Sequence, residues 1–157
     1  MARYLALPGG RGAALDVCCG SGQGAIILQR RGYSPVYAFD RFAGAGKLLT
    51  AHGVKFSCSD FWQYAPPRRF DLITACDCLE HLPEPERVLR RIREWLAPGG
   101  TLFLAVPLEE ELGHNQYHVN AWTREAMLLL LARCEWVIAR ELNDFDQGKI
   151  RFWGLLQ

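Results

Sequence analysis

The sequence predicts an α/β fold with a mostly parallel sheet and helices on both faces. Apolar runs of strand length alternate with helical patterns along most of the chain, which is typical of strand–helix–strand units with right-handed crossovers. A glycine-rich turn joins the first apolar run to the first helix. The last two runs are separated by a short polar stretch, which indicates a closing antiparallel hairpin.

The first half of the chain contains clear start and stop signals. Gly32 follows two arginines and ends the first helix, Gly53 ends the second helix, and Pro66-Pro67 breaks the chain before the fourth strand. The first strand ends at the glycine-rich turn. The elements expected after it are a helix at 22–31, a strand at 36–40, a helix at 42–52, and strands at 54–57 and 70–76.

The second half continues this alternation. Pro83 opens a helix that runs through Leu96, and the turn at 98–100 leads into a fifth strand at 101–106. Residues 107–121 are expected to form a polar loop, and Thr123 is expected to cap the helix that follows it. The last strands are expected at 136–141 and 150–156, joined by a hairpin connection at 143–148.

Composition narrows the class of protein. The chain has 157 residues, of which 50% are hydrophobic, so we expect one domain over 1–157. A net charge of +1 does not indicate binding to nucleic acid or to an anionic membrane, which basic proteins favour. No apolar run is long enough to span a bilayer, and the first residues do not form a signal-peptide pattern. Six cysteines without a Cys-x-x-Cys pair argue against structural zinc. The expected location is the cytoplasm.

The turn after the first strand carries the most informative motif, Asp16-x-Cys18-x-Gly20-x-Gly22. Glycines let the backbone approach a ligand that a Cβ would push away, and the next helix directs free backbone N–H groups at the same place. Two ligands fit this motif. Its glycines and Ala25 match a dinucleotide fingerprint, whereas the acid inside the strand suits the α-amino group of S-adenosylmethionine (SAM).

This motif and three further blocks resemble the class I SAM-dependent methyltransferases. The first motif of that family is Asp/Glu-x-Gly-x-Gly-x-Gly, so Cys18 stands in the place of its first glycine. Residues 71–83 resemble the Asp-x-x-x…Glu-His-Leu block of the group that modifies quinones and sugars, and residues 94–102 resemble its next block. Residues 114–124 resemble the stretch in which a histidine precedes an aromatic–Thr/Ser helix start. The resemblance covers nearly the whole chain.

The resemblance implies a Rossmann-like fold with seven strands in the order 3-2-1-4-5-7-6, the last strand antiparallel, and no N-terminal cap. It implies methyl transfer from SAM to an oxygen, nitrogen or carbon of an unidentified substrate, expected to be a small molecule. Asp40 is implied to accept both ribose hydroxyls, and Asp60 with Phe61 to meet the adenine. The full set implied for the cofactor is Asp16, Cys18, Gly20, Ser21, Gly22, Asp40, Arg41, Asp60, Phe61 and Asp77.

A hydroxyl or protonated amine nucleophile needs a base, because the enzyme must remove its proton. The candidates at the mouth of the implied site are Glu80, His81, Tyr117 and His118, with His114 nearby. Each of these could instead satisfy backbone groups of a loop.

Three alternatives to a metal-free methyltransferase stay open. Because Cys18 breaks the glycine motif, the chain could be a non-catalytic SAM-binding subunit, and a dinucleotide-binding protein is the other binding alternative. Asp77-x-x-Glu80-His81 with the later His118 resembles the metal site of small-RNA terminal 2′-O-methyltransferases. The working expectation is no metal. A homo-oligomer or a partner subunit covering the open substrate side is also left open.

Overall fold

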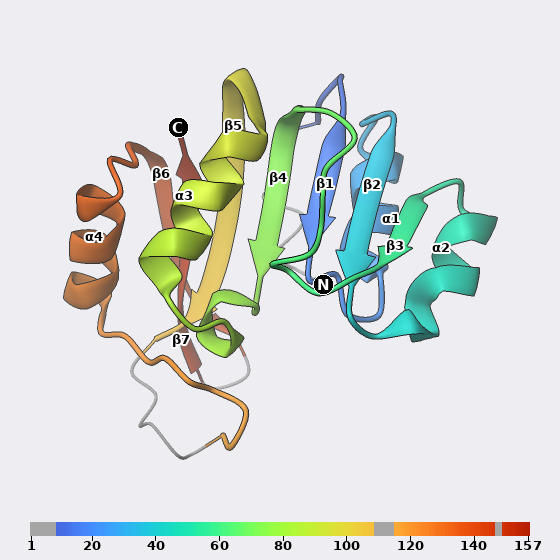
Figure 1. Ribbon diagram of the computed structural model, residues 1–157. Coiled ribbons are helices and arrows are strands. Elements are labelled where there is room, and N and C mark those ends of the chain that lie inside the picture. The colour runs from blue at the N-terminus through green and yellow to red at the C-terminus, as the bar shows by residue number, and fades with distance from the viewer. Residues whose placement is uncertain (1–8, 109–114, 147–148) are drawn as a thin grey trace. The chain divides into compact units, whose positions relative to one another are not determined.

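The computed structural model describes residues 9–108, 115–146 and 149–157 (Figure 1). The chain folds into two compact units. The N-terminal unit holds residues 1–74 and 95–100, and the C-terminal unit holds residues 75–94 and 101–157. The expectation of a single domain therefore stays a prediction. None of the helices among the described residues is long and apolar enough to cross a membrane.

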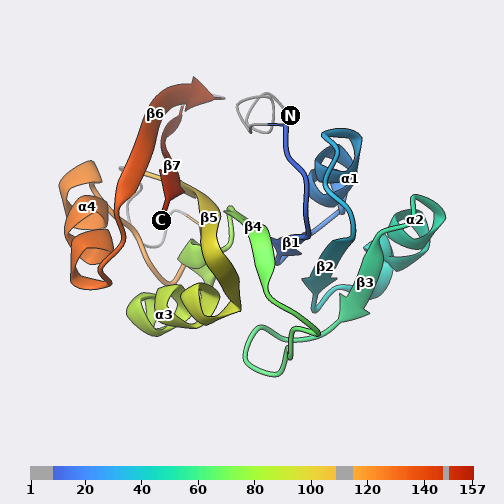
Figure 2. The same ribbon diagram turned by 90° about the horizontal axis from the view of Figure 1, so that it is seen from above.

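The N-terminal unit is built on parallel strands. Strands β1 and β2 pair in parallel, as do β2 and β3, and helices α1 and α2 lie on the same face of these strands (Figures 1 and 2). The elements are β1 (Ala14–Val17), α1 (Gln23–Arg30), β2 (Val36–Asp40), a 3-10 turn (Ala43–Ala45), α2 (Gly46–Ala51), β3 (Lys55–Cys58) and most of β4 (Phe70–Cys76).

An aromatic cluster stabilises this unit. Phe39 of β2 stacks on Tyr64 with ring centroids 3.9 Å apart, and Trp95 packs edge-on against both rings. Phe61 completes the cluster at 5.3 Å from Trp95. All four side chains are buried, and burial raises the pKa of Tyr64 to about 12. The segment after β3 is therefore anchored by its aromatic residues.

The C-terminal unit combines two helices with antiparallel strands. Strand β7 is antiparallel to both β5 and β6. Helices α3 and α4 lie side by side, since Arg133 forms an ion pair with Glu86 at 3.2 Å and the Cys134 thiol donates to the Glu86 carbonyl. The elements are a 3-10 turn (Leu79–His81), α3 (Pro85–Trp95), most of β5 (Leu96–Pro107), α4 (Arg124–Arg133), β6 (Ile138–Asp146) and β7 (Lys149–Leu156).

Backbone hydrogen bonds order the strands β3-β2-β1-β4-β5-β7-β6. This order agrees with the one that the resemblance implies, and the predicted α/β fold class is confirmed. The fourth strand has the predicted bounds. The Thr123 cap is confirmed, because the Thr123 hydroxyl accepts a hydrogen bond from the backbone N–H of Ala126 at 3.2 Å.

Three boundaries differ from the prediction. The second helix is only six residues long, because a 3-10 turn occupies its expected start. Strand β5 begins at Leu96, so the expected turn at 98–100 belongs to the strand. A Cβ at Gly100 would meet the Phe70 carbonyl at 2.8 Å, so glycine lets this run lie close to Phe70. Strand β6 continues to Asp146, and the expected connection at 143–148 was wrong over 143–146, where the backbone of Asp144 pairs with that of Arg151 and Asp146 with Lys149.

Candidate active site

The turn between β1 and α1, residues 18–22, is called the glycine loop here. Three of its residues have left-handed backbones: Cys18 at φ 51°, Gly20 at φ 52° and Gly22 at φ 81°. Non-glycine residues adopt this region at a cost of about 1–2 kcal/mol. Cys18 therefore has a backbone conformation that favours glycine, at the position where the family's motif has its first glycine.

The loop is held in place by β2. The Cys19 N–H donates to the Phe39 carbonyl at 3.0 Å, and the Gly20 N–H donates to Asp40 Oδ2 at 2.8 Å. The other oxygen of this carboxylate, Oδ1, accepts from the Phe42 N–H at 2.8 Å. Each carboxylate oxygen has a further lone pair, so Asp40 can still accept two hydroxyl groups.

The two loop glycines have different reasons to be glycine. A Cβ added at Gly22 would lie 2.7 Å from the Leu49 side chain, which is fully buried. A Cβ added at Gly20 would meet nothing within 4 Å. Gly22 is therefore required by packing, whereas Gly20 leaves open space at the loop surface.

Asp16 lies in the middle of β1 and is 1% exposed. Its Oδ1 accepts a 2.6 Å hydrogen bond from the Thr74 hydroxyl. Its Oδ2 meets no donor of regular geometry among the described residues, although the nearby Ala25 N–H favours the charged form. Burial raises the pKa of this carboxyl to about 6, and the Thr74 hydrogen bond lowers it. Such an oxygen is suited to a bound cation or water behind the loop.

The remaining cofactor candidates of this unit fall into two groups. Ser21 and Arg41 are exposed and can contact a ligand. Asp60 is half-buried and accepts from the Trp62 N–H at 2.9 Å, so it closes a turn, whereas the Phe61 ring belongs to the aromatic cluster. Burial, with the Asp16 and Asp40 carboxylates, raises the pKa of the Cys19 thiol, so this side chain stays protonated.

These observations fit SAM. The left-handed loop is exposed at Gly20 and Ser21 and leaves room there for close approach. Asp40 keeps two acceptor positions for the ribose hydroxyls, and Asp16 Oδ2 in β1 meets no donor of regular geometry within the part of the chain that the structure describes. A dinucleotide would use the same turn but has no need of the buried acid.

The C-terminal unit brings together two segments that are far apart in the sequence. The backbone N–H groups of Val119 and Asn120 donate to the Glu80 carbonyl at 2.8 and 3.2 Å. The Asn120 amide also donates to the carbonyls of Leu79 and Leu82, at 3.2 and 2.7 Å. The Leu79 carbonyl also accepts from the Leu82 N–H at 3.3 Å. Through its bonds to both carbonyls, Asn120 ties the two segments together.

Three predicted catalytic residues meet at this junction: Glu80, His81 and His118, called the histidine cluster here. One potential ligand atom from each lies within 4.8 Å of the others, so the cluster could hold a metal ion. The two imidazole rings meet edge to face with centroids 4.8 Å apart. The Glu80 side chain is 1% exposed, while His81 is exposed. The predicted grouping is present, and Asp77, proposed as a fourth ligand, is not part of it.

Asp77 and the other candidates lie around the cluster. Asp77 follows β4 with φ 50°, and its N–H donates to the Ala105 carbonyl at 2.9 Å. Tyr117 and Val119 flank His118 in the chain and are 69% and 55% exposed. His114 lies outside the described residues.

Comparison with known proteins agrees with this geometry. The family described as "Methyltransferase domain" matches residues 1–145. The chain belongs to the methyltransferase domain family. The resemblance to methyltransferases is thereby confirmed, which supports SAM as the cofactor over a dinucleotide.

Individual relatives of this methyltransferase domain act on different substrates. The ubiquinone biosynthesis O-methyltransferase of Xanthomonas campestris pv. campestris is 34% identical over 113 residues, which are 67% of this chain and 46% of the relative. The (S)-coclaurine N-methyltransferase of Papaver somniferum is 30% identical over 117 residues, 69% of this chain and 33% of the relative. The chain thus spans less than half the length of these curated relatives.

A solved structure shares the fold. The Burkholderia thailandensis 1,6-didemethyltoxoflavin-N1-methyltransferase, with 1,6-didemethyltoxoflavin and S-adenosylhomocysteine bound, has a TM-score of 0.78 to this methyltransferase domain at 20% identity. The match covers 98% of this chain and 73% of that chain.

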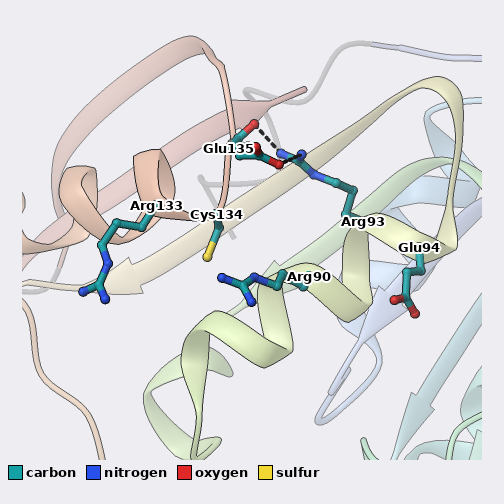
Figure 3. A pocket seen from close by; sticks show the side chains of 6 residues that line it. All are labelled: Arg90, Arg93, Glu94, Arg133, Cys134 and Glu135. Atoms are coloured by element: carbon teal, nitrogen blue, oxygen red, sulfur yellow. Dashed lines mark hydrogen bonds and ion pairs between the residues drawn. The ribbon is translucent and has the colours of Figure 1, made fainter.

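A pocket of about 460 Å³ lies elsewhere in the C-terminal unit, at the carboxyl ends of α3 and α4 (Figure 3). Arg93 reaches the carboxylate and carbonyl of Glu135, and Arg133 is paired with Glu86. Arginines near helix carboxyl ends are stabilised by the helix dipole, so these charges are accounted for by the fold. None of the predicted site residues lines this pocket; its lining is Arg90, Arg93, Glu94, Arg133, Cys134 and Glu135.

Sequence reasoning missed three residues that support the site. Thr74 bonds Asp16, Asn120 ties the two segments together, and Asn115 bonds both Tyr117 and His118: its Oδ1 accepts from the Tyr117 N–H at 3.0 Å and its Nδ2 lies 3.0 Å from His118 Nε2. Asparagine two residues before a turn position is a recognisable signal. The partners of Thr74 and Asn120 are 58 and 38 or more residues away, and no local pattern identifies them.

Proposed function

We propose that this methyltransferase domain transfers the methyl group of SAM to an oxygen or nitrogen of a small molecule, with His81 as the general base. The observation that carries the proposal is the hydrogen bond between His81 Nδ1 and the Tyr117 carbonyl, 2.9 Å long. A carbonyl only accepts, so the proton of the neutral ring sits on Nδ1. The lone pair is then on Nε2, and the side chain is exposed.

The N-terminal unit has the task of holding the cofactor. We propose that Asp40 accepts the ribose hydroxyls and that the exposed glycine loop lies against the methionine portion. The Gly20 and Phe42 N–H groups orient the Asp40 carboxylate, so its geometry is set before a ligand binds. When bound, SAM supplies a methyl group on a positively charged sulfur, and the sulfur keeps the C–S electron pair when the methyl is transferred.

The C-terminal unit has the task of preparing the nucleophile. A substrate hydroxyl or protonated amine gives its proton to His81 Nε2, and the freed lone pair forms the new bond to the methyl carbon as the C–S bond breaks. The products are the methylated substrate, S-adenosylhomocysteine and a protonated His81, which then loses its proton to water. A positioned base of this kind contributes about 10²–10⁴ in rate.

The surface next to the base supports an apolar or aromatic substrate. Tyr117 and Val119 are more than half exposed, and valine is among the residue types most often buried. The relatives named above methylate an oxygen in one case and a nitrogen in the other, so both nucleophiles are included in the proposal.

Metal-assisted transfer is a second candidate, favoured by the close approach of Glu80, His81 and His118. A carboxylate and two imidazoles suit Mn²⁺, Fe²⁺ or Zn²⁺, and a bound ion would lower the pKa of a substrate hydroxyl. Chelation separates the two mechanisms. Full activity after EDTA treatment supports the base, whereas a loss that Mn²⁺ or Mg²⁺ restores supports the metal.

The proposal is tested by incubating the protein with methyl-labelled SAM and a metabolite extract. The expected result is label in a compound that passes a small-molecule filter, with Asp40→Ala protein as the matched control. Calorimetry with S-adenosylhomocysteine accompanies the assay. Protein that binds S-adenosylhomocysteine but transfers no label would indicate the non-catalytic alternative.

A further inference from the structure

The two imidazoles of the histidine cluster are held differently, and the difference can be read atom by atom. His81 is bonded through Nδ1, and its partner is the Tyr117 carbonyl, an obligatory acceptor. His118 is bonded through Nε2, and its partner is the side-chain amide of Asn115 at 3.0 Å. Because a carbonyl only accepts, the His81 bond places a proton on His81 Nδ1. The protonation of His118 Nε2 depends on whether the Asn115 amide turns its oxygen or its NH₂ group towards the ring.

The orientation of the Asn115 amide is set by its other end. Oδ1 lies 3.0 Å from the backbone nitrogen of Tyr117, and a backbone N–H can only donate. The amide oxygen therefore faces Tyr117, and the NH₂ group faces His118. Turning the amide by 180° would place its NH₂ group against the Tyr117 N–H, so that two donors would face each other. The Asn115 NH₂ thus donates to His118 Nε2, and the proton of the neutral His118 ring sits on Nδ1.

We infer that Asn115 is a positioning residue that fixes His118 in the Nδ1–H form and thereby leaves His81 as the only base of the pair. A proton on His118 Nε2 would point at the NH₂ group of Asn115, two donors facing each other. His81 has no such restriction, because its Nε2 is the nitrogen not engaged by Tyr117. Asn115 is not a catalytic residue, since it acts on His118 and not on substrate.

The backbone supports this assignment. The His118 N–H donates to the Asn115 carbonyl at 3.0 Å, so residues 115–118 close a tight turn with the amide inside it. Val119 and Asn120 then tie this turn to Glu80. The rings of His81 and His118 are thus held edge to face, and a single amide determines which ring can take a proton at Nε2.

The inference rests on the proposed function only where it concerns the base. Its test is therefore spectroscopic and needs no substrate. Protein labelled with ¹⁵N-histidine gives long-range ¹H–¹⁵N correlations that distinguish Nδ1–H from Nε2–H rings. The chain has four histidines, and the signals of interest are assigned with His81→Gln and His118→Gln protein.

The expected result at pH 8 is that both His81 and His118 carry the proton on Nδ1. In Asn115→Asp the carboxylate can only accept, so His118 should carry a proton on Nε2. In Asn115→Ala the restriction is lost and the Nε2–H form should become populated. Gln116→Ala, a change of an exposed neighbour, should leave the His118 signals as in the wild type.

An Nε2–H ring at His118 in the wild-type protein would overturn the inference, and so would an unchanged His118 signal in both Asn115 variants. The wild-type spectrum decides even if Asn115→Asp fails to fold. Activity, measured as methyl transfer by the wild-type protein, is a separate arm. A protein that shows the expected spectra and transfers no methyl group contradicts the proposed function alone.

Discussion

The glycine loop presents backbone to a ligand, whereas the histidine cluster presents side chains. The loop is short, and its left-handed residues at 18, 20 and 22 are encoded within one turn of the chain. The cluster depends on residues 80, 81 and 118, and hydrogen bonds from Asn120 tie its two segments together. The loop is therefore sensitive to the size of a side chain, and the cluster is sensitive to where each proton lies.

The glycine loop and the histidine cluster are therefore expected to fail separately when they are mutated. A change in the loop should alter cofactor affinity or folding, and a change in the cluster should alter the rate with cofactor affinity intact. A variant of either region that changes both quantities equally would contradict this division of tasks.

The largest effect is expected for His81→Gln. Removing the base should lower kcat for methyl transfer by about 10²–10⁴, while the affinity for S-adenosylhomocysteine measured by calorimetry stays within twofold of the wild type. His52→Gln is the matched control, because His52 Nδ1 also bonds a backbone carbonyl, that of Leu48 at 3.0 Å. Wild-type kcat in His81→Gln protein would remove the base from the mechanism.

The loop was predictable from sequence because its signal is local. The glycine spacing and the acid in the strand both lie within the seven residues 16–22. The resemblance to methyltransferases added the prediction that Asp40 binds the ribose hydroxyls. The fourth strand was predictable for the same reason: a largely apolar run begins at Phe70, shortly after Pro66-Pro67. Cys18 could be recognised as a departure, but its left-handed backbone is a property of the folded loop.

The cluster was predicted only in part. The resemblance brought Glu80, His81 and His118 together, but it also suggested Asp77, which the structure leaves outside the group. The roles of Asn115 and Asn120 are side-chain hydrogen bonds whose partners depend on how two distant segments fold. The starts and ends of β5 and β6 were misjudged because strand pairing, not local propensity, decides where a strand stops.

The second effect in size concerns the two loop glycines. Gly22→Ala should lower the free energy of unfolding by about 2–4 kcal/mol, since it combines a left-handed alanine with overpacking against Leu49. Gly20→Ala should cost about 1–2 kcal/mol from its backbone alone and should weaken S-adenosylhomocysteine binding. Urea unfolding and calorimetry measure the two quantities. Equal losses of stability in both variants would argue against the packing role of Gly22.

Asp40→Ala is the next test. Loss of hydrogen bonds to a charged acceptor should weaken S-adenosylhomocysteine binding by about 1.5–3 kcal/mol, which is about 10–150-fold. Asp40→Asn, which keeps one carbonyl oxygen for the Gly20 or Phe42 N–H, should lose less. A thermal melt of each variant checks that the loop is still folded. Unchanged affinity in folded Asp40→Ala protein would remove Asp40 from the cofactor site.

The smallest effect tests the buried acid beneath the loop. Burial raises the pKa of Asp16 from an ordinary value of 3.8 to about 6, so the folded protein holds this proton more tightly than the unfolded chain. The contribution of Asp16 to stability is therefore fully present below pH 4 and is lost as the pH rises to about 6.

Asp16→Asn cannot titrate. Relative to the wild type, its free energy of unfolding should rise by about 1–1.5 kcal/mol between pH 5 and pH 8. Urea titrations at both pH values measure this difference, and saturating SAM should reduce it at pH 8 if its ammonium group stabilises the charged carboxylate. A difference between wild type and Asp16→Asn that does not change with pH would show that folding leaves the pKa of Asp16 unchanged, and burial would then not be what determines how this carboxyl titrates.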